Sequence, residues 1–166
     1  MAQITLQGNP CNTSGDLPGA GQTAPQFTLT DATLGERAAS EFAGKTLVLN
    51  IFPSIDTPVC AAAARQFNEK AAALEDVAVL CISKDLPFAL GRFCGAEGLE
   101  NVTALSAFRN PEFGTDYGVA ITDGPLAELF ARAVVVIDNS GKVAYTQLVP
   151  EIAQEPDYDA VLNAIQ

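Results

Sequence analysis

Two nearly continuous apolar runs, at residues 46–52 and 77–82, are typical of strands that are covered on both faces. The alanine-rich segment between them, residues 58–74, favours a helix because alanine has the highest helix propensity. A strand, a helix and a second strand in this order form a right-handed crossover, so the two strands are parallel. The carboxyl ends of both strands are therefore expected at one edge of the sheet.

Weaker patterns on either side of this unit complete the prediction. Turn-forming residues dominate residues 1–25, around short alternating stretches, and indicate an N-terminal β-hairpin or arm. Residues 133–138 and 142–148 alternate around a turn at 139–141 and indicate a second hairpin. The other predicted elements are strands at 27–30 and 102–105, a short helix at 87–93 and an amphipathic helix at 158–165. This order predicts a thioredoxin-like α/β sandwich, in which helices flank a central mixed β-sheet.

Length and charge narrow the class of protein. The 166 residues predict one domain, 1–166, and the 9 basic against 20 acidic side chains give a net charge of −11. Such a negative surface argues against nucleic acid or an anionic membrane as partner. The apolar runs, such as residues 133–137, are far shorter than the ~20 residues that span a bilayer. Residues 1–5 show no secretory signal pattern, so we expect a cytoplasmic protein.

The chain contains no histidine, which excludes Ser-His-Asp and Cys-His catalysis and most zinc sites. Four cysteines remain as candidate nucleophiles: Cys11, Cys60, Cys81 and Cys94. In a cytoplasmic chain such cysteines are typically redox-active or buried rather than structural disulfides. A reactive cysteine here must be activated by something other than an imidazole.

Cys60 has a position that supplies such activation. If Thr57 is the N-cap of the helix, Pro58 stands at the first helical position and Cys60 at the third. Unpaired N–H groups and the helix dipole favour a thiolate in this turn. The same position also suits a small buried residue at a helix start, so this segment alone leaves both interpretations open.

Arg132 and Cys94 are predicted at the same edge of the sheet. Arg132 directly precedes the strand 133–138, and if that strand runs antiparallel to the central ones, its guanidinium can stabilise a Cys60 thiolate. The position is equally compatible with a solvated arginine at a strand end. Cys94 follows the helix 87–93 and lies ~10 Å along it from the sheet. A disulfide needs the two Cα atoms within ~7 Å, so joining Cys60 to Cys94 requires local unwinding.

The remaining features carry less chemistry. Cys81 lies inside a predicted strand and is expected to be inert core, while Cys11 in the N-terminal arm is expected to be a spare thiol. Arg65 stands five positions after Cys60, one short of the phosphatase spacing, and the intervening alanines do not form a phosphate-binding loop. Thr57 occupies the first position of a Cys-x-x-Cys pair, which argues against dithiol exchange of the thioredoxin type.

The sequence resembles the peroxiredoxins, whose motif PxxxTxxC is matched by Pro53, Thr57 and Cys60. It is more closely similar to the bacterial thiol peroxidases, the atypical two-cysteine peroxiredoxins. This likeness covers nearly the whole chain and is carried by residues 50–57, 92–98, 117–121, 131–138 and 155–159.

The resemblance implies a role for each site residue. Cys60 would be the peroxidatic cysteine and Cys94 the resolving cysteine of the same chain, while Thr57 and Arg132 would bind the peroxide oxygens and Pro53 would shield the site. The implied activity is reduction of hydrogen peroxide and organic hydroperoxides through a Cys60–Cys94 disulfide that thioredoxin reduces. A homodimer is implied, and no metal, flavin or haem is required.

One alternative of another class remains open. A redox-sensing or binding module would use the same disulfide as a conformational switch without efficient turnover. The joint presence of Thr57 and Arg132 favours the enzyme, because signalling alone does not need peroxide-binding groups.

Overall fold

The computed structural model describes residues 1–71 and 74–165. Its strands are β1 (Gln3–Leu6), β2 (Asn9–Asn12), β3 (Thr28–Asp31), β4 (Glu36–Ala38), β5 (Thr46–Ile51), β6 (Val77–Ser83), β7 (Val102–Ser106), β8 (Ala133–Ile137) and β9 (Val143–Leu148). Its helices are α1 (Pro58–Ala71), α2 (Pro87–Glu97), α3 (Glu112–Asp116) and α4 (Tyr158–Ile165), with a 3₁₀ turn, η1, at Ala39–Phe42.

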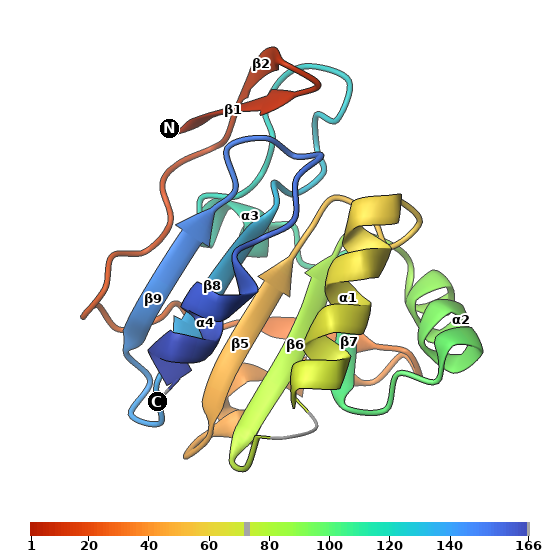
Figure 1. Cartoon of the computed structure of the whole chain (residues 1–166), viewed down its shortest axis with the longest axis vertical. Coiled ribbons are helices and arrows are strands. Elements are labelled where there is room, and N and C mark those ends of the chain that lie inside the picture. The colour runs from red at the N-terminus through yellow and green to blue at the C-terminus, as the bar shows by residue number, and fades with distance from the viewer. Residues whose placement is uncertain (72–73, 166) are drawn as a thin grey trace.

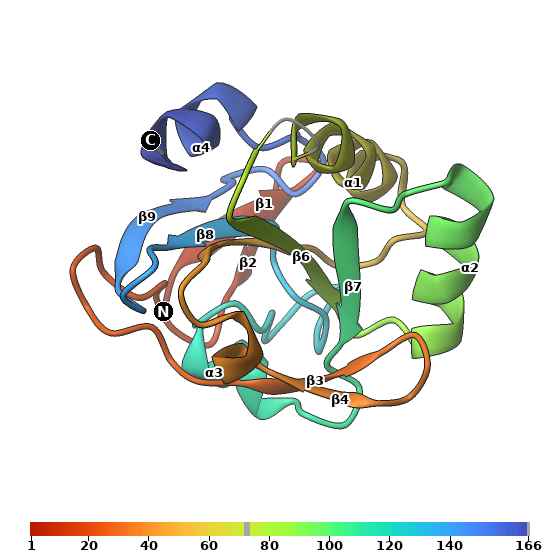
Figure 2. The same ribbon diagram turned by 90° about the horizontal axis from the view of Figure 1, so that it is seen from below.

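A mixed sheet in the order β4-β3-β7-β6-β5-β8-β9 forms the centre of the molecule. The strands β5, β6 and β7 are parallel to one another, whereas β8 pairs antiparallel with β5 and β9 antiparallel with β8. The helices α1 and α4 cover one face, and the sheet curves so that β3 and β4 lie opposite them (Figures 1 and 2). This arrangement confirms the thioredoxin-like α/β fold, and the separate hairpin β1–β2 confirms the predicted N-terminal hairpin.

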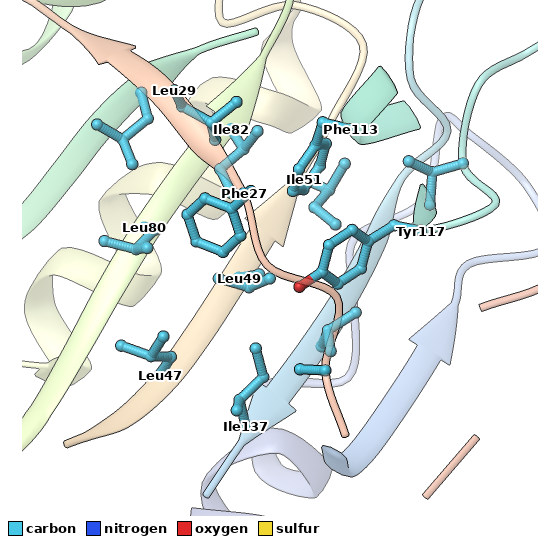
Figure 3. Packing of buried hydrophobic residues seen from close by; sticks show 14 of the residues in the cluster. Phe27, Leu29, Leu47, Leu49, Ile51, Leu80, Ile82, Phe113, Tyr117 and Ile137 are labelled. Atoms are coloured by element: carbon cyan, nitrogen blue, oxygen red, sulfur yellow. The ribbon is translucent and has the colours of Figure 1, made fainter. Parts of the chain in front are cut away.

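The central strands are buried on both faces, as their apolar runs predict. In β5, Leu47, Leu49 and Ile51 pack into the cluster on the β3 side, shown in Figure 3, while Val48 packs into the cluster beneath the helices. This alternation follows from the two-residue period of a strand. Burial on both faces fixes the register of β5, so the segment that follows its carboxyl end starts from a rigid position.

The element boundaries differ from the prediction mainly at the helix ends. The prediction extended the helix α1 (Pro58–Ala71) to residue 74; residues 72–73 of that prediction lie outside the described residues, and Leu74 is not helical. The prediction ended α2 at residue 93, but it continues to Glu97 and stops at Gly98, which takes a left-handed conformation with φ 65°. Cys94 therefore lies inside the helix rather than after it.

Three short elements, β4, η1 and α3, have no counterpart in the prediction because each is too short to show a hydrophobic period. No helix within the described ranges is long and apolar enough to cross a membrane.

Candidate active site

The segment between β5 and α1 is held in place by one carboxylate. Asp85, just after β6, accepts hydrogen bonds from the Ser54 hydroxyl and the Ile55 N–H, both at 2.7 Å. The Ser83 hydroxyl donates to the same carboxylate at 2.6 Å. Pro53 is buried at the start of this segment. Asp85 therefore ties the segment before α1 to the carboxyl end of the neighbouring parallel strand.

The helix α1 begins at Pro58, as predicted, and places Cys60 in its first turn. The Thr57 carbonyl accepts the first helical hydrogen bond, from the Ala61 N–H at 3.0 Å. The Thr57 hydroxyl donates to the Ser54 carbonyl at 2.9 Å, so it steadies the preceding segment. Cys60 is completely buried, within the apolar cluster of the helical face.

Arg132 contacts the Cys60 sulfur. Because β8 is antiparallel to β5 and Ala133 stands opposite Ile51, the residue before β8 reaches the edge at which α1 begins. The Nη2 of Arg132 donates to the Cys60 Sγ at 3.2 Å, and its Nε donates to the Ile152 carbonyl at 2.8 Å. Arg132 is only 1% exposed, so the alternative of a solvated strand-end arginine is wrong.

The guanidinium of Arg132 is buried without a carboxylate partner in the described part of the chain. Among the described residues the ion pairs include none with Arg132, so no carboxylate neutralises its buried guanidinium. A buried cation is stabilised by an opposite charge at contact distance, and the Cys60 sulfur is the group that lies at this distance. The Nη1 of Arg132 has no hydrogen-bond partner within the described part of the chain. This nitrogen is a donor that a ligand oxygen near the sulfur can use.

The other three cysteines lie in apolar surroundings. All four cysteines are free thiols. Burial raises the pKa of Cys94, which is half-buried within α2, and raises the pKa of Cys81 to about 12. Cys81 is buried in β6, as predicted. Cys11 is buried in the N-terminal hairpin, where desolvation and the nearby Asp123 and Glu151 raise its pKa. These three thiols are therefore disfavoured as thiolates.

Two parts of this site were missed from the sequence. Asp85 follows a predicted parallel strand at the active edge, so its position was an available signal. The Ile152 carbonyl that holds Arg132 is a backbone group in a loop, and no side-chain pattern indicates it. Within residues 1–71 and 74–165 no group of three or more His, Cys, Asp or Glu side chains is placed to hold a metal ion.

The fold is thioredoxin-like, and the first turn of α1 carries a cysteine that contacts a buried arginine. Together these features define a thiol-based redox protein. Comparisons with known proteins refine this class. The family model described as Redoxin matches residues 19–162. The chain is 62% identical to a thiol peroxidase of Mycobacterium tuberculosis strain H37Rv, over 99% of both chains. It is 59% identical to a thiol peroxidase of Corynebacterium glutamicum, again over 99% of both.

Solved structures agree with this relationship. A peroxiredoxin-like protein from Aquifex aeolicus superposes with a TM-score of 0.94 at 42% identity, over 99% of this chain and 96% of the other. A thiol peroxidase from Chromobacterium violaceum shares the fold, with a TM-score of 0.87 at 24% identity over 97% and 93% of the chains. The chain therefore belongs to the Redoxin family and, within it, to the thiol peroxidases.

Proposed function

We propose that this enzyme reduces hydrogen peroxide and organic hydroperoxides, with Cys60 as the peroxidatic residue. The observation that carries the proposal is the buried Arg132, whose Nη2 contacts the Cys60 sulfur while its Nη1 has no partner in the described chain. One guanidinium can thus stabilise the thiolate and still donate to a peroxide oxygen beside it.

The first step is a displacement at oxygen. The Cys60 thiolate attacks the terminal oxygen of ROOH and the O–O bond breaks; the leaving alkoxide, or hydroxide where the substrate is hydrogen peroxide, takes a proton from solvent to become ROH or water. Sulfur is oxidised to sulfenic acid and the peroxide is reduced by the same two electrons. The Nη1 of Arg132 would donate to the peroxide as charge develops. The Thr57 hydroxyl would turn its proton from the Ser54 carbonyl to the second oxygen, and the buried Pro53 would keep water from the sulfur.

The second step joins Cys94 to Cys60. The Cys94 thiol would condense with the sulfenic acid, release water and form an intramolecular disulfide, which thioredoxin would reduce by thiol exchange. Both cysteines lie within helices in this structure, and Cys60 is fully buried. Cys94 would reach Cys60 only after α2 unwinds locally.

Gly95, one of the two interior glycines of α2, suits such unwinding. Gly95 follows Cys94, and a Cβ at this position would meet nothing within 4 Å, so no close packing demands a glycine. Glycine costs a helix about 1 kcal/mol relative to alanine. We expect Gly95→Ala to slow disulfide formation about fivefold, because a more stable helix unwinds less often, while the first oxidation of Cys60 keeps its rate.

The measurement follows both steps by rapid quenching with an alkylating reagent and mass spectrometry, since the chain has no tryptophan to report fluorescence. The exposed neighbour Ala96 offers the matched opposite change, and Ala96→Gly is expected to speed disulfide formation. If both variants form the disulfide at the wild-type rate, helix unwinding does not limit this step.

The same proposal places the enzyme in the cytoplasm as a homodimer with thioredoxin as its reductant. The exposed large apolar side chains include Leu86 and Phe88 at the start of α2, and Phe108 after β7. Such side chains gain stability when a second surface covers them, which is consistent with a protein partner.

The proposal is tested with the purified enzyme, a hydroperoxide and a thioredoxin–thioredoxin reductase system. We expect sustained peroxide consumption, and peptide mapping of the peroxide-treated protein without reductant should show Cys60 linked to Cys94. Formation of this disulfide with sluggish peroxide consumption would favour the redox-sensing alternative. Absence of the linkage would contradict the assignment of Cys94.

A further inference from the structure

The N-terminal hairpin lies beyond the ends of β5 and β6, beside the loop that follows β9 (Figure 1). The first strand of the hairpin, β1, pairs with this loop through backbone hydrogen bonds. The Thr5 N–H donates to the Pro150 carbonyl at 2.8 Å, and the Ile152 N–H donates to the Thr5 carbonyl at 2.9 Å. Ile152 therefore connects the hairpin to the active site, because its N–H donates to the hairpin and its carbonyl accepts from Arg132.

Glu151 fastens this contact. Its Oε1 accepts from the Thr5 hydroxyl at 3.0 Å and from the Gly8 N–H at 2.9 Å. Its Oε2 accepts from the Ala153 N–H at 2.9 Å. One carboxylate thus binds the first strand of the hairpin, its turn and the loop itself. These hydrogen bonds favour the charged form and lower the pKa of Glu151 to about 2, so the carboxylate is ionised at any physiological pH.

Apolar packing completes the junction. Ile152 is 4% exposed and packs with Ile4 and Cys11 of the hairpin. The same cluster includes Ala131, the neighbour of Arg132. The carbonyl of Ile152 accordingly has little freedom to move while the hairpin is docked. A guanidinium held at Nε by a fixed acceptor has its plane and both Nη directions restricted as well.

We propose that Glu151 is a positioning residue, and that the docked hairpin acts through Ile152 to aim the Arg132 guanidinium at the Cys60 sulfur. The path runs from the Glu151 carboxylate to the hairpin, from Thr5 to the Ile152 backbone, and from its carbonyl to Arg132. This role explains why a hairpin outside the central sheet is packed against the active edge. It rests on the proposed peroxidase function of Cys60.

The chain offers a matched control. Asp123 also binds the hairpin, because it accepts from the Asn12 N–H at 2.8 Å and from the Asn12 side-chain amide at 2.7 Å. It lies on a different loop and does not adjoin Ile152. Glu151→Ala and Asp123→Ala each remove one negative charge and one anchor of the hairpin. A merely structural role predicts similar effects of the two changes.

We expect Glu151→Ala to lower the rate constant of Cys60 oxidation by hydroperoxide roughly tenfold, since small misplacements of catalytic groups are costly. Asp123→Ala should change this rate constant less than about twofold, although it should lower the melting temperature about as much as Glu151→Ala does. Glu151→Gln should restore part of the rate, because its amide oxygen still accepts from the hairpin. The rate is measured in a single oxidation without reductant, by quenching and mass spectrometry.

A second readout does not depend on peroxidase chemistry. In a ¹⁵N NMR spectrum, the Nε–H of Arg132 should exchange slowly with water in the wild type and in Asp123→Ala, and faster in Glu151→Ala. Equal exchange in all three proteins, or equal losses of rate in the two alanine variants, would overturn the positioning role. A wild type that does not react with hydroperoxide but shows the NMR difference would refute the proposed function and leave the positioning of Arg132 intact.

Discussion

Arg132→Met is expected to lower the rate constant of Cys60 oxidation by hydroperoxide roughly 10²–10³-fold, the usual cost of losing a donor to developing oxygen charge. The Nη2 contact with the Cys60 sulfur and the unpartnered Nη1 are both lost. The protein should remain folded, because methionine fills a similar volume and the Cys60 thiol can keep its proton once the guanidinium is gone, so that no unpaired charge is left buried. A loss of activity without loss of melting temperature would assign the effect to chemistry.

The experiment measures the single oxidation of Cys60, the melting temperature and the ultraviolet absorbance of the thiolate near neutral pH. We expect less thiolate in Arg132→Met, because the neighbouring cation is gone. Arg132→Lys keeps the charge but loses the planar fork that binds the Ile152 carbonyl and the sulfur together, so it should recover only a small part of the rate. Arg109, which lies over the Phe108 ring, provides a control in Arg109→Met, expected to behave as wild type.

A folded Arg132→Met protein that oxidises within about threefold of the wild-type rate would contradict the role of this arginine. Such a result would leave the helix start as the sole source of activation for Cys60. That source is weaker, because the effect of a helix dipole at a terminus is typically below 1 kcal/mol.

The central fold could be predicted because its signals are local. The apolar runs of β5 and β6 and the alanines of α1 determine a crossover, and the crossover places the start of α1 at the carboxyl edge of the sheet. The end of α2 could not be predicted in the same way. The low helix propensity of Gly95 favours an end of the helix at this point, yet the helix continues through Gly95 and stops at Gly98.

The active site, too, could be predicted only where local sequence patterns determine it. Cys60 and Arg132 could be placed from strand directions, because each stands next to an element with a strong pattern. Whether Arg132 was solvated or buried could not be decided, since burial depends on what covers the edge. Arg132 is covered by the loop at residues 149–153 and the hairpin docked on it. The hydrogen bonds that hold this cover involve backbone groups, so no side-chain pattern in the sequence predicts them.

The two proposed catalytic cysteines are expected to fail in different ways when they are replaced. Cys60→Ser should abolish peroxide consumption, because the thiolate is the nucleophile and a serine hydroxyl is not ionised beside Arg132. Cys94→Ser should keep the first oxidation at the wild-type rate and then stop, because the sulfenic acid has lost its condensing thiol. The measurement is peroxide consumed per chain, with and without the thioredoxin system.

Cys81 provides the control that separates a resolving cysteine from any nearby thiol. Cys81 and Cys94 pack in the same cluster beneath the helices, but burial raises the pKa of Cys81 to about 12 and its strand has no glycine that would let it leave. Cys81→Ala should therefore keep sustained turnover, whereas Cys94→Ser should lose it. If Cys81→Ala stops turnover while Cys94→Ser sustains it, the resolving thiol comes from the sheet, and unwinding of α2 has no place in the reaction.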